Sequence, residues 1–279
     1  AETFAFIRLS GFDAVWDDFA ATPPGRIWQS QPFQQFYSQL ESQLQAAIQK
    51  MPEKDREDAG FVFNLVRFLP RKPMAAGLMS LPPDQQKTEV PFSMFLVVDA
   101  GQDKARLQSL LSEFEPPADL VDTRTIAGAP FKALKQSDPP LFYGWIGNTF
   151  AISFNDPADR IIHGLARNRE SLTLPARLRS SEFAGGYMLG WFDIQKLVAA
   201  IGDLPDVQDE DLAQVRTVLD RLGLSQVQYL ATGMSFRDGK VVSDQFLAVP
   251  DTRKGVFSAL GQVQPDIFRA VEPRAVTAA

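Results

Sequence analysis

The chain has 279 residues, of which 45% are hydrophobic and 22% charged, a composition typical of a globular protein with one large domain or two small ones. Its net charge of −6 argues against nucleic acid as a partner, because such a protein needs basic residues to neutralise phosphates. The absence of cysteine excludes disulfides, thiolate nucleophiles and iron–sulfur clusters, and no uncharged apolar run approaches the ~20 residues of a transmembrane segment.

The first part of the chain predicts strands and helices in alternation. A buried strand over 4–9 leads into a short helix over 11–19, and the Thr22-Pro23-Pro24-Gly25 stretch then breaks the chain. The clearest helix follows, because its apolar residues repeat with the spacing of a single helix face: Phe33, Phe36, Tyr37, Leu40, Leu44 and Ile48. A short helix over 58–68, a hairpin of strands over 73–81 and 92–98, and a helix that stops before Pro116 are expected next.

The middle of the chain predicts short strands and one helix. Strands over 120–126 and 130–135 flank Gly128, and Gly147-Asn148 is a tight-turn signal between strands over 141–146 and 149–154. Asp156 and Pro157 are typical of the first residues of a helix.

The last part repeats this alternation. A strand over 186–192 and a helix over 194–201 precede a helix marked by Leu212, Val215, Leu219 and Leu222. A hairpin over 226–236 and 240–249 is closed by Asp238-Gly239, which favours a type I′ turn, and a short helix over 256–260 follows.

Two regions, about 2–114 and 186–260, share one order of elements. Ala75-Ala76-Gly77-Leu78 parallels Ala231-Thr232-Gly233-Met234, although chance similarity between apolar strands is the alternative. We therefore predict an α+β fold with a mainly antiparallel sheet, helices packed on one face, and an internal duplication of a β-α-α-β-β-α unit. The units would span 1–118 and 185–279, joined by the middle strands and helix over 119–184, with the second unit cut short at the C-terminus.

Residues that could perform a reaction are dispersed. His163 is the only histidine, so a multi-histidine zinc site or a two-histidine iron site is excluded. The acidic run over 203–211 lacks the spacing of a calcium loop. Three carboxylate pairs leave a carboxylate-dependent hydrolase as an unfavoured alternative: Asp17/Asp18, Glu113/Glu115 and Asp156/Asp159. We expect no catalytic residue, metal or cofactor.

Aromatic residues are the better candidates for binding. The 22 phenylalanines predict a phenylalanine-rich core, or else an apolar groove for a lipid or a partner. Trp28 follows the Pro-Pro-Gly stretch and is expected to be the most exposed tryptophan. Trp28, Phe33 and Trp16 are therefore the residues expected to contact a ligand or partner.

Four segments carry a resemblance that covers most of the chain: Thr3-Phe4-Ala5-Phe6-Ile7-Arg8, Thr125-Ile126-Ala127-Gly128-Ala129-Pro130, Phe154-Asn155-Asp156-Pro157 and Phe246-Leu247-Ala248-Val249-Pro250. With these segments the chain resembles a large group of uncharacterised exported bacterial proteins that carry a domain of unknown function. The resemblance implies export, often with a signal peptide or membrane anchor on the full protein, and it supplies no catalytic residues.

The beginning of the chain agrees with that implication. It opens with Ala1-Glu2-Thr3, without an initiator methionine, as a mature end left by signal-peptide removal would, although a trimmed chain would begin in the same way. We expect a non-catalytic protein of the periplasm or cell envelope that binds or scaffolds a protein partner. The alternative is a carrier for a lipid or another apolar ligand.

Overall fold

The computed structural model describes residues 3–80, 92–112, 115–135, 137, 140–154, 186–196, 199, 209–250 and 258. Its strands are β1 Thr3–Leu9, β2 Met74–Ser80, β3 Phe92–Asp99, β4 Val121–Ile126, β5 Ala129–Leu134, β6 Leu141–Ile146, β7 Thr149–Phe154, β8 Met188–Asp193, β9 Tyr229–Arg237 and β10 Lys240–Ala248. Its α-helices are α1 Trp16–Ala20, α2 Pro23–Gln29, α3 Gln31–Gln49, α4 Glu53–Phe68, α5 Lys104–Ser112 and α9 Asp209–Leu222. Its 3-10 turns are η1 Phe12–Val15, η2 Leu69–Arg71, η3 Gly101–Asp103, η4 Ala118–Leu120 and η6 Leu224–Gln226.

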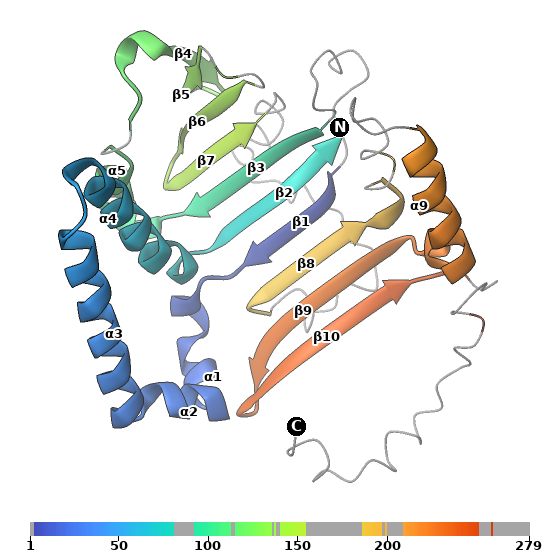
Figure 1. Cartoon of the computed structure of the whole chain (residues 1–279), viewed down its shortest axis with the longest axis horizontal. Coiled ribbons are helices and arrows are strands. Elements are labelled where there is room, and N and C mark those ends of the chain that lie inside the picture. The colour runs from blue at the N-terminus through green and yellow to red at the C-terminus, as the bar shows by residue number, and fades with distance from the viewer. Residues whose placement is uncertain are drawn as a thin grey trace.

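All ten strands form one antiparallel sheet in the order β10-β9-β8-β1-β2-β3-β7-β6-β5-β4 (Figure 1). β1 and β8 are neighbours, with Ile7 opposite Gly190, while Ile7 faces Ala76 of β2 on its other side. From this pair, β1-β2-β3 and β8-β9-β10 run outward in chain order, and the remaining four strands extend the sheet beyond β3. The predicted α+β class and the antiparallel sheet are confirmed.

The Thr22-Pro23-Pro24-Gly25 stretch separates α1 from α2, but it is not irregular beyond Thr22, because α2 begins at Pro23. The Thr22 hydroxyl oxygen accepts a hydrogen bond from the Gly25 N–H at 3.1 Å and so caps the helix. The prolines occupy the first helical positions, where a missing N–H costs nothing. The helix predicted over 58–68 is also longer than expected, since α4 starts at Glu53.

Two hairpin turns are formed by pairs of residues with positive φ angles. Asp238 and Gly239 have φ angles of 51° and 70°, the pattern of the predicted type I′ turn. Ala127 and Gly128 repeat this pattern at 52° and 81° between β4 and β5. Local turn chemistry therefore sets the register of both hairpins.

One face of the sheet carries the contacts with three of the described helices. Phe68 of α4 and Leu107 of α5 are buried with Val98 of β3. Phe19 of α1 packs on Phe236 of β9, with ring centroids 5.3 Å apart. The strand register places Phe236 and Val98 on the same face, so α1, α4 and α5 all contact that face.

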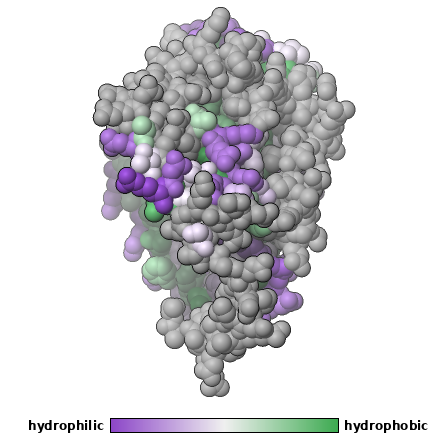
Figure 2. Space-filling model, turned by 90° about the vertical axis from the view of Figure 1, so that its right-hand side faces the viewer, coloured by the Kyte–Doolittle hydropathy of each residue, from purple (hydrophilic) through white to green (hydrophobic). Residues whose placement is uncertain are grey.

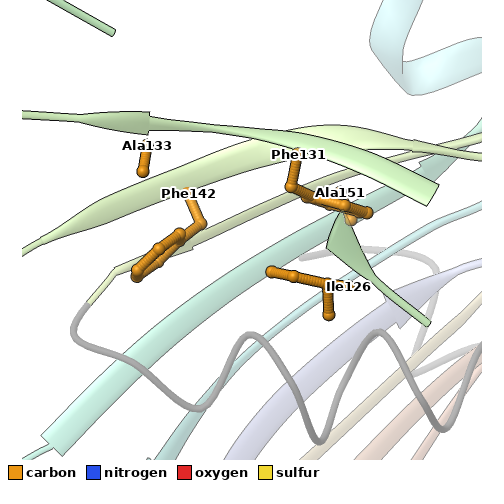
Figure 3. Packing of buried hydrophobic residues seen from close by; sticks show 5 residues of the cluster. All are labelled: Ile126, Phe131, Ala133, Phe142 and Ala151. Atoms are coloured by element: carbon orange, nitrogen blue, oxygen red, sulfur yellow. The ribbon is translucent and has the colours of Figure 1, made fainter. Parts of the chain in front are cut away.

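A second core cluster lies on the opposite face, where β4–β7 meet β3. It consists of buried side chains that converge in Figure 3: Ile126, Phe131, Ala133, Phe142 and Ala151. Gly144 lies opposite Phe131 across the β5–β6 pair, and a Cβ there would lie 2.7 Å from the Phe131 ring. The absence of a side chain at Gly144 therefore lets the Phe131 ring fill the space above the neighbouring strand.

Several predicted elements lie outside the described residues. They are the helix that begins at Asp156 and, apart from residue 258, the short helix over 256–260. Of the helix predicted over 194–201, only 194–196 and 199 are described, and these residues are helical.

Candidate functional site

The apolar face predicted for α3 exists, but much of it lies at the surface rather than in a core. Phe36 is 59% exposed, Leu40 41% and Leu44 46%. We call the residues of this face the α3 stripe: Phe33, Phe36, Tyr37, Leu40, Leu44 and Ile48. In Figure 1, α3 stands at one side of the sheet, between α2 and α4.

The N-terminal end of the α3 stripe is held by aromatic packing. The Trp28 ring of α2 lies 5.1 Å from the Phe33 ring and 5.3 Å from the Tyr37 ring, measured between centroids. Trp28 and Phe33 are both half-buried by this packing. The structure therefore brings together two of the three aromatic residues singled out in the sequence, and it places Trp28 in a helix rather than in an irregular stretch.

Trp16 belongs to a different aromatic cluster, at the start of α1. Its ring lies 5.6 Å from Phe12 and 5.8 Å from Phe19. Phe19 in turn packs on Phe236 of the sheet. Trp16 thus helps to seat α1 beside the sheet and is not part of the α3 stripe.

The polar side of α3 carries almost no charge. Its sequence, QPFQQFYSQLESQLQAAIQ, contains seven glutamines and one charged residue, Glu41. The Glu41 carboxylate pairs with the Arg67 guanidinium of α4 at 2.6 Å. An apolar stripe flanked by neutral amides is consequently available to a partner without any cost for displacing ions.

The opposite end of the molecule has a different character. Figure 2 looks onto the side occupied by α9, and the described residues that reach the surface there are mostly hydrophilic, with smaller hydrophobic areas between them. Leu222 of α9 is 41% exposed, as is Leu40 of α3. The two leucines form a matched pair for mutation.

A second feature is a pocket of about 260 Å³ where α4, η2, η3 and α5 meet η1. We call it the Phe68 pocket, and its lining consists of Asp13, Arg67, Phe68, Arg71, Lys72, Asp103 and Arg106. The sequence does not indicate this pocket, because its lining comes from three segments that are far apart in the chain.

Ion pairs organise the Phe68 pocket. The Lys72 ammonium lies 2.5 Å from the Asp103 carboxylate and 3.5 Å from that of Asp13. Asp13 also accepts a hydrogen bond from the Arg71 guanidinium at 2.9 Å. The hydrogen bond to Asp103 raises the pKa of Lys72, and the same bond lowers the pKa of Asp103.

This pairing predicts a pH-dependent contribution to stability. Because the folded pKa of Asp103 is lowered, its contribution is complete above its unfolded pKa of about 4 and is lost as the pH falls through the folded pKa. The contribution of Lys72 is also stabilising but depends on pH in the opposite direction: it is complete below about pH 10 and is lost as the pH rises through the raised pKa.

We expect Asp103→Asn to lower the free energy of unfolding at pH 7, and the difference from the unaltered chain to shrink as the pH falls below about 4. Urea unfolding at a series of pH values measures this difference. Asp58→Asn is the control, since Asp58 is exposed and makes no ion pair among the described residues. A difference for Asp103→Asn that is constant from pH 7 to pH 2 would contradict the pairing.

Of the candidate carboxylates, only Asp17, Asp18 and Glu115 lie within the described residues. Asp17 and Asp18 are both exposed on α1, and Glu115 pairs with Lys132 of β5. Glu113, Asp156, Asp159, the acidic run over 203–208 and His163 lie outside the described residues.

The described residues also bear on metals and membranes. Within the described ranges, no three potential metal ligands lie together, and no helix has the length and apolar character needed to cross a membrane. Comparison with known proteins gave no match to any family model, curated protein or solved structure.

Proposed function

We propose that this chain is a non-catalytic exported protein that binds an amphipathic helix of a protein partner in the cell envelope through the α3 stripe. The observation that carries the proposal is the exposure of a continuous apolar helix face. Exposed apolar surface of this kind costs solubility, and in soluble proteins it marks interaction sites.

The spacing of the stripe favours a helix as the occupant. Within it, Phe33, Tyr37, Leu40 and Leu44 follow one another at intervals of four, three and four residues. This is the repeat with which a second helix packs its own side chains between those of the first. Helix-in-groove recognition uses anchors at the same positions.

The neutral flanks favour a protein over a lipid surface. Helices that lie on membranes carry lysine and arginine on the polar face, next to the anionic headgroups. α3 has no basic residue between Gln31 and Gln49, and its single carboxylate is paired with Arg67. Glutamine side chains instead offer neutral hydrogen-bonding groups at the rim of a helix–helix interface.

The experiment that tests this proposal places a photoreactive amino acid at position 44 of the chain in its source organism. We expect a crosslink to one protein, with the crosslinked peptide lying in an amphipathic helix, and recovery of the complex from the extracytoplasmic fraction. The same amino acid at position 222 is the control. A crosslink at position 44 only to lipid, only to a second copy of the chain, or to nothing would overturn the proposal.

Leu40→Asp is expected to weaken binding of the crosslinked partner by about 10–100-fold, because it buries a charge in the apolar interface. The free energy of unfolding should change by less than about 1 kcal/mol, since Leu40 is already 41% exposed. Leu222→Asp, at equal exposure on α9, should leave the affinity unchanged. Titration calorimetry with the purified partner measures both variants, and equal losses would contradict a role for the α3 stripe.

We also infer that β1–β3 and β8–β10 arose from one duplicated unit. The two sets run outward from the β1–β8 pair in mirrored order. Gly77 of β2 lies opposite Phe6 of β1, and Gly233 of β9 lies opposite Leu189 of β8, as equivalent strands would require. If the inference is correct, the rotation that superposes β1 on β8 also superposes β2 on β9, with Gly77 on Gly233. An experimental structure in which Gly77 and Gly233 did not coincide would contradict it.

A further inference from the structure

The Phe68 pocket concentrates positive charge in a chain whose net charge is −6. Four cations line it, namely Arg67, Arg71, Lys72 and Arg106, against the two carboxylates Asp13 and Asp103, which leaves +2 for the lining. Glu41, outside the lining, neutralises Arg67 and reduces this to +1. A bound anion would balance this remaining charge.

Arg106 differs from the other three cations of the lining in its distance from the carboxylates. Arg67, Arg71 and Lys72 each have a carboxylate within ion-pair distance. Among the described residues, Arg106 has none, and its guanidinium lies over the Phe68 ring at 5.7 Å from the centroid. The Lys72 ammonium lies at the same distance from that ring. Two cations thus border one aromatic floor. Lys72 is in an ion pair with Asp103, whereas Arg106 only contributes, through its charge, to lowering the pKa of the same carboxylate.

We propose that the Phe68 pocket binds a small dianion of the phosphate class, either inorganic phosphate or the phosphate group of a monoester, with Arg106 as its principal ligand. A planar guanidinium donates two parallel hydrogen bonds to such an oxyanion. Arg71 and Lys72 lie beside it, but each is already paired with a carboxylate, Asp13 and Asp103 respectively, so that Arg106 supplies most of the attraction.

The size of the pocket limits the ligand. Its volume is about 260 Å³, below the roughly 300–1,000 Å³ of sites for drug-sized molecules. The floor is Phe68, which is 3% exposed and therefore offers little surface for stacking a large ring. The pocket thus accommodates a phosphate with a short substituent.

Isothermal titration of the full chain with inorganic phosphate at constant ionic strength tests the proposal. We expect saturable binding, and Arg106→Gln should weaken it by about tenfold or more through loss of the charge-assisted hydrogen bonds. Arg124→Gln is the matched control, because it removes the same charge outside the pocket. Arg124 is on β4, and its guanidinium lies 5.2 Å from the centroid of the Phe142 ring. Arg124→Gln should change the affinity by less than about twofold.

Two further arms sharpen the result. Asp103→Asn removes one negative charge from the lining and should tighten phosphate binding, whereas a purely structural ion-pair network would only lose stability. Glycerol phosphate in place of inorganic phosphate identifies the source, because a monoester site should bind it more tightly. No saturable binding of either probe by the unaltered chain, or equal weakening by Arg106→Gln and Arg124→Gln, would overturn the proposal.

Discussion

The Phe131→Ala variant is expected to lose about 3–5 kcal/mol of unfolding free energy. Phe131 is 1% exposed and lies at the centre of the cluster formed by β4–β7 and β3. Its ring fills the space over Gly144, so alanine at position 131 would leave a cavity with no side chain on the opposite strand to enter it. Ladder hydrogen bonds between β5 and β6 would keep the backbone from closing the gap.

Equilibrium unfolding in guanidinium chloride, followed by circular dichroism, measures this loss. Phe36→Ala is the control, because it removes the same side chain from a site that is 59% exposed, and its cost should be below about 1 kcal/mol. Similar losses for the two variants would show that Phe131 does not occupy the core position that Figure 3 displays.

The Gly25→Ala variant is expected to lower the free energy of unfolding by about 3 kcal/mol. A Cβ at this position would lie 1.9 Å from the Phe19 carbonyl oxygen and 2.8 Å from the Ala20 Cα, and both atoms are backbone that cannot swing aside. To relieve the clash, α2 would have to move away from α1. Since α2 carries Trp28, which packs on Phe33, this movement should also displace the base of the α3 stripe.

Thermal and urea unfolding of Gly25→Ala can be compared with Gly60→Ala. Gly60 lies within α4, and a Cβ there meets nothing within 4 Å. Alanine at position 60 should therefore stabilise the chain by about 0.5–1 kcal/mol, because it removes backbone freedom from the unfolded state. A Gly25→Ala variant as stable as the unaltered chain would contradict the close packing of α1 on α2.

Local sequence signals explain which elements were predicted correctly. The Gly147-Asn148 and Asp238-Gly239 turns select hairpins by backbone conformation alone, and their strands lie where expected. The spacing of apolar residues likewise identified α3 without knowledge of its neighbours. Pro23 and Pro24 begin a helix that the sequence analysis does not predict, because the Thr22 side chain caps it.

The candidate sites were predictable only in part. The sequence indicates Trp28 and Phe33 as contacts for a ligand or partner, and in the structure they are half-buried and pack together at the end of the α3 stripe. The sequence does not predict the Phe68 pocket. Arg67 and Arg71 are four residues apart, which is the spacing of neighbouring side chains on one helix face. Their spacing alone indicates a solvated helix surface. The pocket exists because Asp103 and Arg106 arrive from another segment.

The sequence alone determined the α+β class, the positions of most strands and helices, and the turns, because these depend on backbone preferences and on periodicity over a few residues. The tertiary structure decided which apolar faces are covered. The periodicity of α3 is that of a helix packed in a core, yet Phe36, Leu40 and Leu44 remain exposed. It also decided which charges meet around Phe68, since burial and ion pairing depend on contacts between segments that are distant in the chain.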